Sequence, residues 1–559
     1  MHPKSKKLTT KNQELRTKYV FISGGVLSSL GKGITTASLG MLLASKGYKV
    51  TIVKCENYLN VDAGLINPIE HGDTFLCDDG TEADMDIGNY ERFLNRDLGG
   101  HNFITLGQIY QSVITRERNF GYEGEDVEAI PHVTDEIIRR IKDAARIDKA
   151  EICLIELGGT VGEYQNVLYY EASRIMKLDH DDTVIHVHVS YLPTPSHVGE
   201  PKTKPTQLSV KQLNAMSIQP DFLVARTESE FDSRRRERLA LFCNLKPDDI
   251  IINQNVESMY QVPLAFHEQN FDTLLLKKLG LEDSRSNLTS WKSLVKKALG
   301  KKKGKITIAI VGKYFATGSY KLTDSYHALI ETLEHTAINL ETDLELKYIN
   351  SALIETDGVG QLEGVDGIVV PIGWGARGTE GKIRAVQYAR ENKIPFLGLC
   401  YGMQLASVEF ARNVVGLKGA NSEEIDPDTK HPIIHSIPFD EKYQTIKGDG
   451  TSMRLGAFDC VLKEGSLAHE IYGTTKISER HRHRYEFNNE YRKRLEDQGF
   501  VISGTSPDDF FVEMIELPRK DHPFFLATQA HPEYKSRPLA PHPVFLAYIR
   551  ATIAHSTSL

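Results

Sequence analysis

The sequence predicts an α/β fold with two parallel-sheet domains, the first of P-loop type. Short apolar runs rich in β-branched residues alternate with helix-like segments, which is typical of parallel α/β units. The alternation stops near residue 300 and then restarts, and a glycine-rich turn joins the first run to a helix-like segment. The length of 559 residues also exceeds the roughly 250–300 residues that one hydrophobic core usually supports.

The first set of predicted strands lies in the amino-terminal half of the chain. Its runs are almost continuously apolar, so both faces of the sheet should be buried, as they are in parallel sheets. These strands are expected at 19–25, 49–55, 151–159, 183–190, 221–226 and 250–256.

A lysine-rich and glycine-rich stretch, "KKALGKKKGK" at 296–305, separates the two sets. We interpret it as a solvated linker, because the charge is local and the chain as a whole carries a formal charge of −8. The second set of strands is expected at 306–314, 344–350, 366–375 and 395–400.

The composition is that of an ordinary globular enzyme, with 40% hydrophobic and 25% charged residues. The negative net charge disfavours a nucleic-acid partner, and no apolar run is long enough to span a bilayer. The first residues, "MHPKSKKLTTKNQELRTK", lack the apolar segment of a signal peptide, so we expect a frayed basic tail and a cytoplasmic protein. The six dispersed cysteines are expected to be free thiols.

The glycine-rich turn "SGGVLSSLGKG" indicates an anion site, because the N–H groups of the following helix would face its ligand. Lys32 would contact phosphate oxygens, as in a P-loop. The usual P-loop spacing places a glycine at 26 and a hydroxyl at 33, where this chain has Val26 and Gly33. The turn is therefore a divergent P-loop, with a purely structural strand-to-helix connection as the alternative.

Two further features fit a polyphosphate ligand. Asp86 in "EADMDIGNYERF" and Glu156 at a strand end supply hard oxygens that suit Mg²⁺. Lys202 and Lys204 in "GEPKTKPTQ" lie between two prolines and could form a second phosphate clamp. Composition alone leaves open whether this segment is a clamp or an exposed basic loop.

The stretch "GLCYGMQ" predicts a nucleophile at a sharp strand-to-helix turn, with Cys400 presented between two glycines. The segment "ATQAHPEY" offers His531 as the base and Glu533 as the group that orients it. The N–H groups of Tyr401 and of Gly373 in "PIGWGARG" are candidate oxyanion donors. A buried core cysteine is the alternative interpretation.

The stretch "SERHRHRYEFNN", in which His481 and His483 alternate with arginines, is a candidate for a metal site. The stretch offers no thiol and surrounds both imidazoles with cations, so a metal is not expected there.

In their order along the chain, these motifs resemble those of the CTP synthase family over nearly the whole length. The resemblance implies an N-terminal synthase domain of P-loop type and a C-terminal class I glutamine amidotransferase α/β domain. The motifs are "GGVLSSLGKG", "NVDAG", "HGD", "DGTEADMDIGNYERF", "GGTVG", "KTKPTQ", "GLCYGMQ", "MRLG", "RHRHRYE" and "HPE".

The resemblance also implies the reaction. ATP would phosphorylate O4 of the UTP ring, and ammonia released from glutamine would travel inside the protein and displace that phosphate to give CTP. GTP would activate glutamine hydrolysis. A homotetramer is expected, with filament formation left open. The implied organisation is a basic tail at 1–18, a synthase domain at 19–283, a linker at 284–304 and an amidotransferase domain at 305–555.

The roles of residues in the synthase domain are carried over motif by motif. The resemblance implies that Lys32 and its loop hold ATP, that Mg²⁺ is bound by Asp86 and Glu156, and that Arg226 faces adenine. The ATP loop would comprise Ser29, Leu30, Gly31, Lys32, Gly33 and Ile34, and the uridine nucleotide would be faced by Ser28, Lys202, Lys204, Gln207 and Arg238.

In the amidotransferase domain the resemblance implies a triad of Cys400, His531 and Glu533. The glutamine substrate would be held by Gly373, Gln404, Glu424 and Arg484.

The chain departs from the family pattern at several positions. The usual "PGGFG" is "PIGWG", which introduces Ile372 and Trp374, and "QFHPE" is "QAHPE". The acidic pair after "GGTVG" is Glu163 and Gln165, and Arg238 replaces a commoner lysine. Feedback inhibition by CTP is therefore predicted less directly than catalysis.

Two other functions would fit parts of the sequence. One is an ATP-dependent amidotransferase with a carboxylate acceptor, against which "KTKPTQ" and "DMDIGNYERF" argue. The other is a catalytically silent nucleotide-binding or filament-forming protein, against which the intact Cys400, His531, Glu533 and Lys32 argue.

Overall fold

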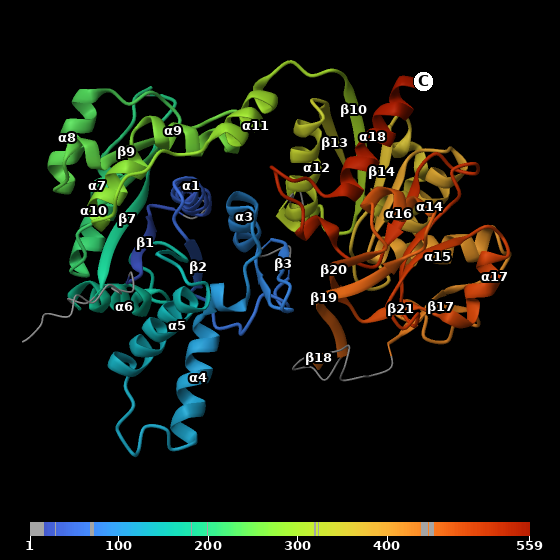
Figure 1. Cartoon of the computed structure of the whole chain (residues 1–559), viewed down its shortest axis with the longest axis horizontal. Helices are drawn as coiled ribbons and strands as arrows, with labels where there is room; N and C mark the ends of the chain where they lie inside the picture. The colour runs from blue at the N-terminus through green and yellow to red at the C-terminus, as the bar shows by residue number, and fades with distance from the viewer. Residues whose placement is uncertain are drawn as a thin grey trace, which may run out of the picture. The chain divides into compact units, whose positions relative to one another are not determined.

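The computed structural model describes residues 16–27, 30–67, 72–179, 182–197, 199–317, 320–321, 324–437, 445–446 and 452–558 (Figure 1). By its contacts the chain divides into two compact units. The first comprises Met1–Val61 and His101–Thr289, and the second comprises Asp62–Gly100 and Ser290–Leu559. The segment 62–100 therefore packs with the carboxy-terminal part of the chain, and the domain boundaries expected from the sequence stay a prediction.

The first unit contains a seven-stranded sheet in which all strands are parallel. The strands are rich in valine and isoleucine, and all residues of β2 and β6 are buried, as expected for strands covered on both faces. Their order is β5 (Phe103–Thr105), β2 (Val50–Glu56), β6 (Ile152–Leu157), β1 (Lys18–Gly25), β7 (Thr183–Leu192), β8 (Phe222–Thr227) and β9 (Ile250–Gln254).

The helices of the first unit pack on this sheet through amphipathic faces. In α5, Ile137, Ile141 and Ala144 recur at helical spacing and are buried, whereas Arg139 and Arg146 lie on the other face. The helices are α1 (Lys32–Ser45), α4 (Leu106–Arg118), α5 (Thr134–Ile147), α6 (Val167–Leu178), α7 (Lys204–Ala215), α8 (Ser233–Cys243), α9 (Val262–Glu268) and α10 (Phe271–Leu279).

Strand β1 lies at the centre of this sheet, between β6 and β7. Because the three strands are parallel, their carboxyl ends meet at one edge of the sheet. The glycine-rich turn that follows β1 and the "LGGTVG" stretch that ends β6 therefore come together at that edge: the Val161 N–H donates to the Gly24 carbonyl at 2.8 Å.

The second unit contains a larger sheet that is parallel on one side and antiparallel on the other. Strands β13, β10, β14, β15 and β24 are parallel, and from β24 onward the neighbours run antiparallel. The order is β13 (Asp343–Asn350), β10 (Lys305–Gly312), β14 (Gly367–Val370), β15 (Phe396–Leu399), β24 (Phe525–Thr528), β23 (Val512–Glu516), β22 (Val501–Thr505), β19 (Ser452–Leu462) and β18 (Thr445–Ile446), with β20 (Lys476–His483) also paired to β19.

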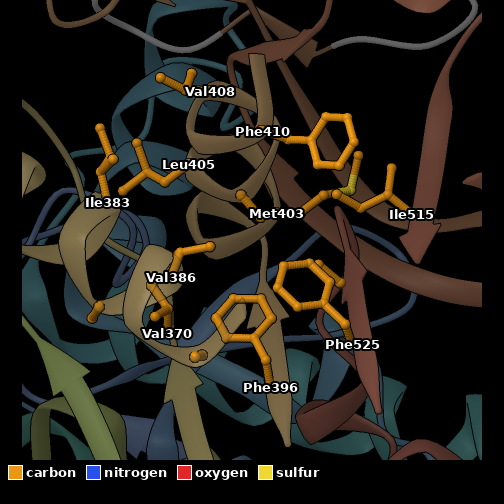
Figure 2. Packing of buried hydrophobic residues seen from close by; sticks show 14 of the residues in the cluster. Val370, Ile383, Val386, Phe396, Met403, Leu405, Val408, Phe410, Ile515 and Phe525 are labelled. Carbon is orange, nitrogen blue, oxygen red and sulfur yellow. The ribbon is translucent and has the colours of Figure 1, made fainter. Parts of the chain in front are cut away.

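Helices α14 and α15 cover one face of this sheet with a closely packed core (Figure 2). Phe396 and Phe525, on neighbouring strands, stack with their ring centroids 4.5 Å apart, and Met403 and Leu405 of α15 pack in the same cluster. Together with α14 (Thr379–Glu391) and α15 (Tyr401–Asn413), the helices of the unit are α11 (Thr289–Leu299), α12 (His327–Asn339), α13 (Ser351–Asp357), α16 (Leu467–Tyr472), α17 (Arg492–Glu496) and α18 (Pro543–Ser558).

The segment 62–100 joins the second unit through buried charges. It contains the hairpin β3 (Thr74–Leu76) and β4 (Glu82–Asp84) and helix α3 (Met85–Leu94). Glu91 of α3 is fully buried and accepts hydrogen bonds from Arg480 at 3.0 and 3.2 Å and from Arg537 at 2.5 Å. This ion network fixes the segment against β20 and the carboxy-terminal region.

All ten strands expected from the sequence are present, and the α/β class is confirmed. The antiparallel strands were not predicted.

The stretch that is a candidate for a metal site forms β20, in which His481 and His483 are buried. Burial lowers the pKa of both imidazoles. Among the described residues, no three His, Cys, Asp or Glu side chains form a metal-binding group.

The cysteine prediction is confirmed, because all six thiols are free and buried. No helix within the described parts of the chain is long and apolar enough to cross a membrane. Residues 1–15 of the expected basic tail lie outside the described residues.

We predict that Glu91→Gln lowers the free energy of unfolding of the second unit by about 3 kcal/mol, because two buried arginines lose a shared carboxylate. The only two tryptophans, Trp291 and Trp374, belong to this unit, so tryptophan fluorescence during urea unfolding measures the change.

The matched control is Asp97→Asn. Asp97 pairs with the same two arginines, but its side chain is 54% exposed, so the expected loss is below about 1 kcal/mol. Equal losses in the two variants would contradict the role given to Glu91.

Candidate active sites

Cys400 occupies a sharp turn between β15 and α15. It is the residue that precedes the first turn of the helix, with φ 52° and ψ −101°. A non-glycine residue at positive φ is strained, and such strain is held in place only by the surrounding packing. The turn aims the thiol away from the strand and next to the helix N-terminus, as the sequence predicts.

The turn is tight because two backbone segments approach each other closely. A Cβ at Gly402 would lie 2.0 Å from the Val370 carbonyl oxygen, and one at Gly398 would lie 2.8 Å from the Ala527 Cβ. Glycine at these two positions is therefore required for α15 to pack against β14 and for β15 to pack beside β24.

The neighbouring strand β24 brings His531 to the thiol. Leu399 and Thr528 are paired at the ends of the two parallel strands, and the Cys400 N–H donates to the Thr528 carbonyl at 2.8 Å. The His531 N–H in turn donates to the Arg480 carbonyl at 2.8 Å. Cys400 and His531 thus leave the sheet from adjacent strand ends.

His531 and Glu533 form a buried pair, with 2.7 Å between Nδ1 and Oε1. Burial opposes a charge on the imidazole, but the Glu533 carboxylate and then the Cys400 sulfur outweigh it and raise the pKa of His531 to about 10. The Nε2 atom is buried, and the Cys400 thiol is the side chain that interacts with it. The ring is thus oriented by Glu533, and its second nitrogen is open to exchange a proton.

The Cys400 sulfur has two polar neighbours. It donates to the Arg482 carbonyl at 3.7 Å, and the Gln529 Nε2 donates to it at 3.5 Å. Gln529 was not singled out from the sequence, although it lies two residues before His531 in the same motif.

The two predicted oxyanion donors are both available. In the loop 371–375, the Trp374 N–H donates to the Tyr314 hydroxyl at 3.2 Å and the Gly375 N–H donates to Glu424 at 2.7 Å. The N–H groups of Gly373 and Tyr401 have no hydrogen-bond partner among the described residues. Two unused donors beside a nucleophile can stabilise a tetrahedral intermediate.

The residues expected to hold glutamine lie near this centre, but some have structural partners. Gln404 is buried and donates to the Tyr485 carbonyl at 2.8 Å and to Gln529 at 3.2 Å. Glu424 supports the loop through Gly375, and the charge of Arg484 acts on its carboxyl group. Burial raises the pKa of Glu424. Their contact with glutamine stays a prediction.

In the first unit, two of the described residues of the glycine-rich turn have positive φ. Gly31 has φ 90° before α1, and Val26 has φ 81°, so the valine adopts the left-handed conformation that a glycine would take. Such strain costs on the order of 1–3 kcal/mol. Lys32 Nζ donates to the Gly159 carbonyl at 2.6 Å, which links this turn to the end of β6. Leu30, Gly33 and Ile34 are described, whereas Ser28 and Ser29 lie outside the described residues.

Glu156 lies at the same strand end and is 1% exposed. It accepts from Lys54 Nζ at 2.9 Å, and Lys54 also pairs with Glu56 at 3.2 Å. The hard oxygen fits Mg²⁺, and with no larger acidic group among the described residues, phosphate oxygens and water would complete its shell. Asp86 belongs to the second unit, in the first turn of α3.

The basic segment before α7 forms a cavity of about 520 Å³ rather than a featureless loop. Four of the residues predicted to face the uridine nucleotide line it together: Lys202, Lys204, Gln207 and Arg238. Glu200 pairs with Lys202 at 2.5 Å and with Arg235 at 3.2 Å, so a bound anion would have to compete with this carboxylate.

Three further predicted residues surround the P-loop edge. Arg226 is close to the turn, since a Cβ at Gly31 would lie 3.8 Å from its Nη1. Glu163 accepts from the Thr160 N–H at 2.8 Å and from Asn57 at 3.0 Å, whereas Gln165 is exposed. Their ligands stay predictions.

Comparison with known proteins decides the family. Residues 18–281 match the family described as "CTP synthase N-terminus", and residues 321–551 match "Glutamine amidotransferase class-I". A CTP synthase of Halalkalibacterium halodurans is 47% identical over 541 residues, covering 96% of this chain and 100% of that protein. The chain belongs to the CTP synthase family.

Other relatives agree. A CTP synthase of Caldanaerobacter subterraneus is 47% identical over 538 residues, covering 96% of this chain and 98% of that protein. Among solved structures, the glutaminase domain of Trypanosoma brucei CTPS with bound acivicin is 36% identical, with a TM-score of 0.40 over 44% of this chain and 94% of that chain. The CTP synthase resemblance and both predicted fold types are confirmed by the family matches.

Some residues near the Cys400 site of this CTP synthase family member were not identified from the sequence. Lys313 and Lys382 are buried beneath the loop 371–375, and Arg482 supplies the carbonyl next to the thiol. Lys313 directly follows an apolar strand, which is a signal that could have been used. Lys382 lies in a helix and carries no comparable signal.

We predict that Glu533→Gln makes glutamine hydrolysis fall off at a lower pH than in the unsubstituted enzyme. Without the carboxylate, the pKa of His531 falls from about 10 toward its ordinary range, so the imidazole loses its charge at lower pH. We expect kcat/KM for glutamine hydrolysis to fall at least about 10-fold at pH 9 and less at pH 6.5. A pH profile between 6 and 10 measures this, and an alkaline limb at the same pH as in the unsubstituted enzyme would contradict it.

Proposed function

We propose that this chain is a glutamine-hydrolysing ligase that converts UTP, ATP and glutamine into CTP, ADP, phosphate and glutamate. The observation that carries the proposal is the Cys400, His531 and Glu533 geometry in a chain that matches CTP synthases over 96% of its length. The amidotransferase part alone would fit many acceptors, and the "CTP synthase N-terminus" match over residues 18–281 specifies UTP.

In the glutaminase step, His531 Nε2 holds the proton of the Cys400 thiol, and the thiolate sulfur attacks the amide carbon of glutamine. The oxyanion forms between the N–H groups of Gly373 and Tyr401. Collapse of the intermediate breaks the C–N bond, and the imidazolium donates its proton to the leaving ammonia. Water then attacks the thioester, with His531 as the base, and glutamate is released. Glu533 stabilises the imidazolium throughout.

In the synthase step, O4 of UTP attacks the γ-phosphorus of ATP and ADP leaves. Ammonia then attacks C4, and the O4 phosphate departs to give CTP. Lys32 and the N–H groups at the start of α1 support the ATP phosphates, and Lys202, Lys204 and Arg238 support the triphosphate of UTP. Ammonia has to stay unprotonated between the two reactions, which favours transfer without release into water.

Several assignments complete the proposal. Glu156, with Asp86 as a second carboxylate expected from the sequence, would hold Mg²⁺, which would offset the charge of the ATP phosphates. GTP as an activator, a homotetrameric assembly and a cytoplasmic location rest on the family resemblance and the sequence. Filament formation stays open.

The reaction itself tests the proposal. Purified protein is mixed with UTP, ATP, Mg²⁺ and glutamine, and the absorbance change from uracil to cytosine is followed. CTP formation that requires all four components is expected, whereas phosphate release without conversion of the base would contradict the proposal.

We predict that Cys400→Ala abolishes CTP formation from glutamine and preserves it from ammonium salts, because only the nucleophile for hydrolysis is removed. Rates with both nitrogen sources are measured on the same preparation. Cys460→Ala, at another buried thiol of the same unit, is the matched control and should retain glutamine-dependent activity. Loss of both activities in Cys400→Ala would contradict two separate reaction sites.

We predict that Lys32→Ala removes CTP formation with either nitrogen source, because the ATP phosphates lose a cation, while basal glutamine hydrolysis persists. The expected loss of kcat is at least about 100-fold. Lys49→Ala, on the loop just before β2, is the control. Normal turnover in Lys32→Ala would assign the turn a structural role.

A further inference from the structure

Two buried lysines lie beneath the loop 371–375, and neither has a role in the steps proposed for glutamine hydrolysis. Lys313 follows β10 and is 3% exposed, and Lys382 lies in α14 and is 0% exposed. The hydrogen bonds of the two ammonium groups go to carbonyl and hydroxyl oxygens. Neutral oxygens and the Tyr401 ring offset the desolvation of the two ammonium groups less well than a paired carboxylate would. The burial of two lysines here therefore points to a role in function.

The contacts of the two lysines cover the loop 371–375 almost completely. Lys382 Nζ donates to the Pro371 carbonyl at 2.7 Å and to the Ile372 carbonyl at 3.2 Å. Lys313 Nζ donates to the Trp374 carbonyl at 3.0 Å and also to the Gly375 carbonyl. The carbonyl groups on both sides of Gly373 are thereby held in place.

These contacts also fix the direction of the Gly373 N–H. In a trans peptide the C=O and N–H point in opposite directions. Because the Ile372 carbonyl is bonded to Lys382, with the Tyr326 hydroxyl at 3.4 Å, the Gly373 N–H of the same peptide points away from them. Gly373 also rests directly on the lysines, since a Cβ there would lie 3.1 Å from both Lys313 Cδ and Lys382 Nζ.

The same lysines contact the residue that carries the second oxyanion donor. The Tyr401 ring has Lys313 Nζ 4.5 Å from its centroid and Lys382 Nζ 5.4 Å away. The Tyr401 hydroxyl lies 3.4 Å from Lys313 Nζ and 2.8 Å from Thr379 Oγ1. Both halves of the donor pair are therefore supported by one polar cluster.

We infer that Lys313 and Lys382 are positioning residues for glutamine hydrolysis, which orient the N–H groups of Gly373 and Tyr401 toward the oxyanion that forms at Cys400. This role rests on the proposed glutaminase function and adds two residues to it. This role also explains why Ile372 and Trp374 are tolerated beside Gly373. The lysines bond backbone carbonyl groups, which are present whatever the side chain is.

The electrostatic environment agrees with this placement. Burial lowers the pKa of Lys313 to about 8, against the opposing effect of Glu424. Burial and then the charge of Lys313 lower the pKa of Lys382, while the Cys400 sulfur raises it. Lys382 is thus close enough to the sulfur for the two charges to interact, and an amine donates hydrogen bonds whether or not it is charged.

The test compares Lys313→Met and Lys382→Met with the unsubstituted enzyme. Each variant removes the donors and keeps most of the side-chain volume. For Lys313→Met we expect kcat for glutamine hydrolysis to fall about 100-fold with KM within about threefold, because the loss affects the transition state. For Lys382→Met, which loses the bond to the carbonyl of the peptide that carries the Gly373 N–H, we expect a fall of at least the same size. CTP formation from ammonium should be unchanged in both.

Two chemical probes of Cys400 separate positioning from general damage. Reaction with 6-diazo-5-oxo-L-norleucine, a glutamine analogue with a carbonyl group, should slow in parallel with kcat. Alkylation by iodoacetamide, measured against Cys400→Ala, needs no oxyanion donor and should stay within about threefold. Equal slowing of both reactions would overturn the inference and assign the lysines a structural role.

The matched control is Lys305→Met, at the start of the same strand β10. Its side chain is 59% exposed and pairs with Glu345 at the surface, so hydrolysis should be unaffected. If Lys313→Met fails to fold, Tyr401→Phe removes the hydroxyl beside Lys313 and Thr379 without a change in charge. A five- to tenfold lower kcat, on the order of one lost neutral hydrogen bond, is then expected, and an unchanged kcat would overturn the inference.

The controls also separate the two proposals. If the unsubstituted enzyme and Lys305→Met form no CTP from glutamine, the proposed function fails. If they form CTP and Lys313→Met hydrolyses glutamine at the normal rate, only the inference on the lysines fails.

Discussion

The hydrogen bond from the Cys400 N–H to the Thr528 carbonyl is the constraint on which the glutaminase site depends. It extends the β15–β24 ladder by one residue beyond the last pair, Leu399 and Thr528. The thiol and the segment that carries His531 therefore leave the sheet at the same level. A slip of one residue in this register would turn the side chains to opposite faces, so the apolar packing of Phe396 on Phe525 also protects the catalytic geometry.

Buried cations surround this site, and they fall into two groups. Arg480 and Arg482 are paired with the carboxylates of Glu91 and Glu82, so their desolvation is offset by ion pairs. Lys313 and Lys382 donate hydrogen bonds to neutral oxygens and lie over the Tyr401 ring, which offset desolvation less well than a paired carboxylate. The arginines thus fix the segment 62–100 in its unit, whereas the lysines are retained at a cost in stability, as is common where a site needs a particular geometry.

Sequence reasoning found most of the parallel strands and the triad because both follow from local patterns, but it missed the short parallel strands β5 and β24. Continuous apolar runs mark parallel strands; Cys400 directly follows β15, and His531 lies three residues after the end of β24. The antiparallel strands could not be predicted in the same way. A strand such as β20 is buried but rich in His and Arg, so it lacks the apolar pattern of a buried strand, and its charges are compensated only after folding. The association of the segment 62–100 with the second unit depends on Glu91 meeting Arg480 across 389 positions, which no local pattern reveals.

Both units place a helix N-terminus beyond a parallel strand, at a residue with positive φ. In the first unit this residue is Gly31, with φ 90°, and in the second it is Cys400, with φ 52°. Glycine tolerates the conformation, whereas the cysteine is strained because the reacting sulfur has to be at that point. In each case backbone N–H groups face the position where negative charge is expected, on phosphates or on an oxyanion. Since the backbone supplies these donors, Val26, Gly33 and Ile372 can replace the usual residues while the donors remain.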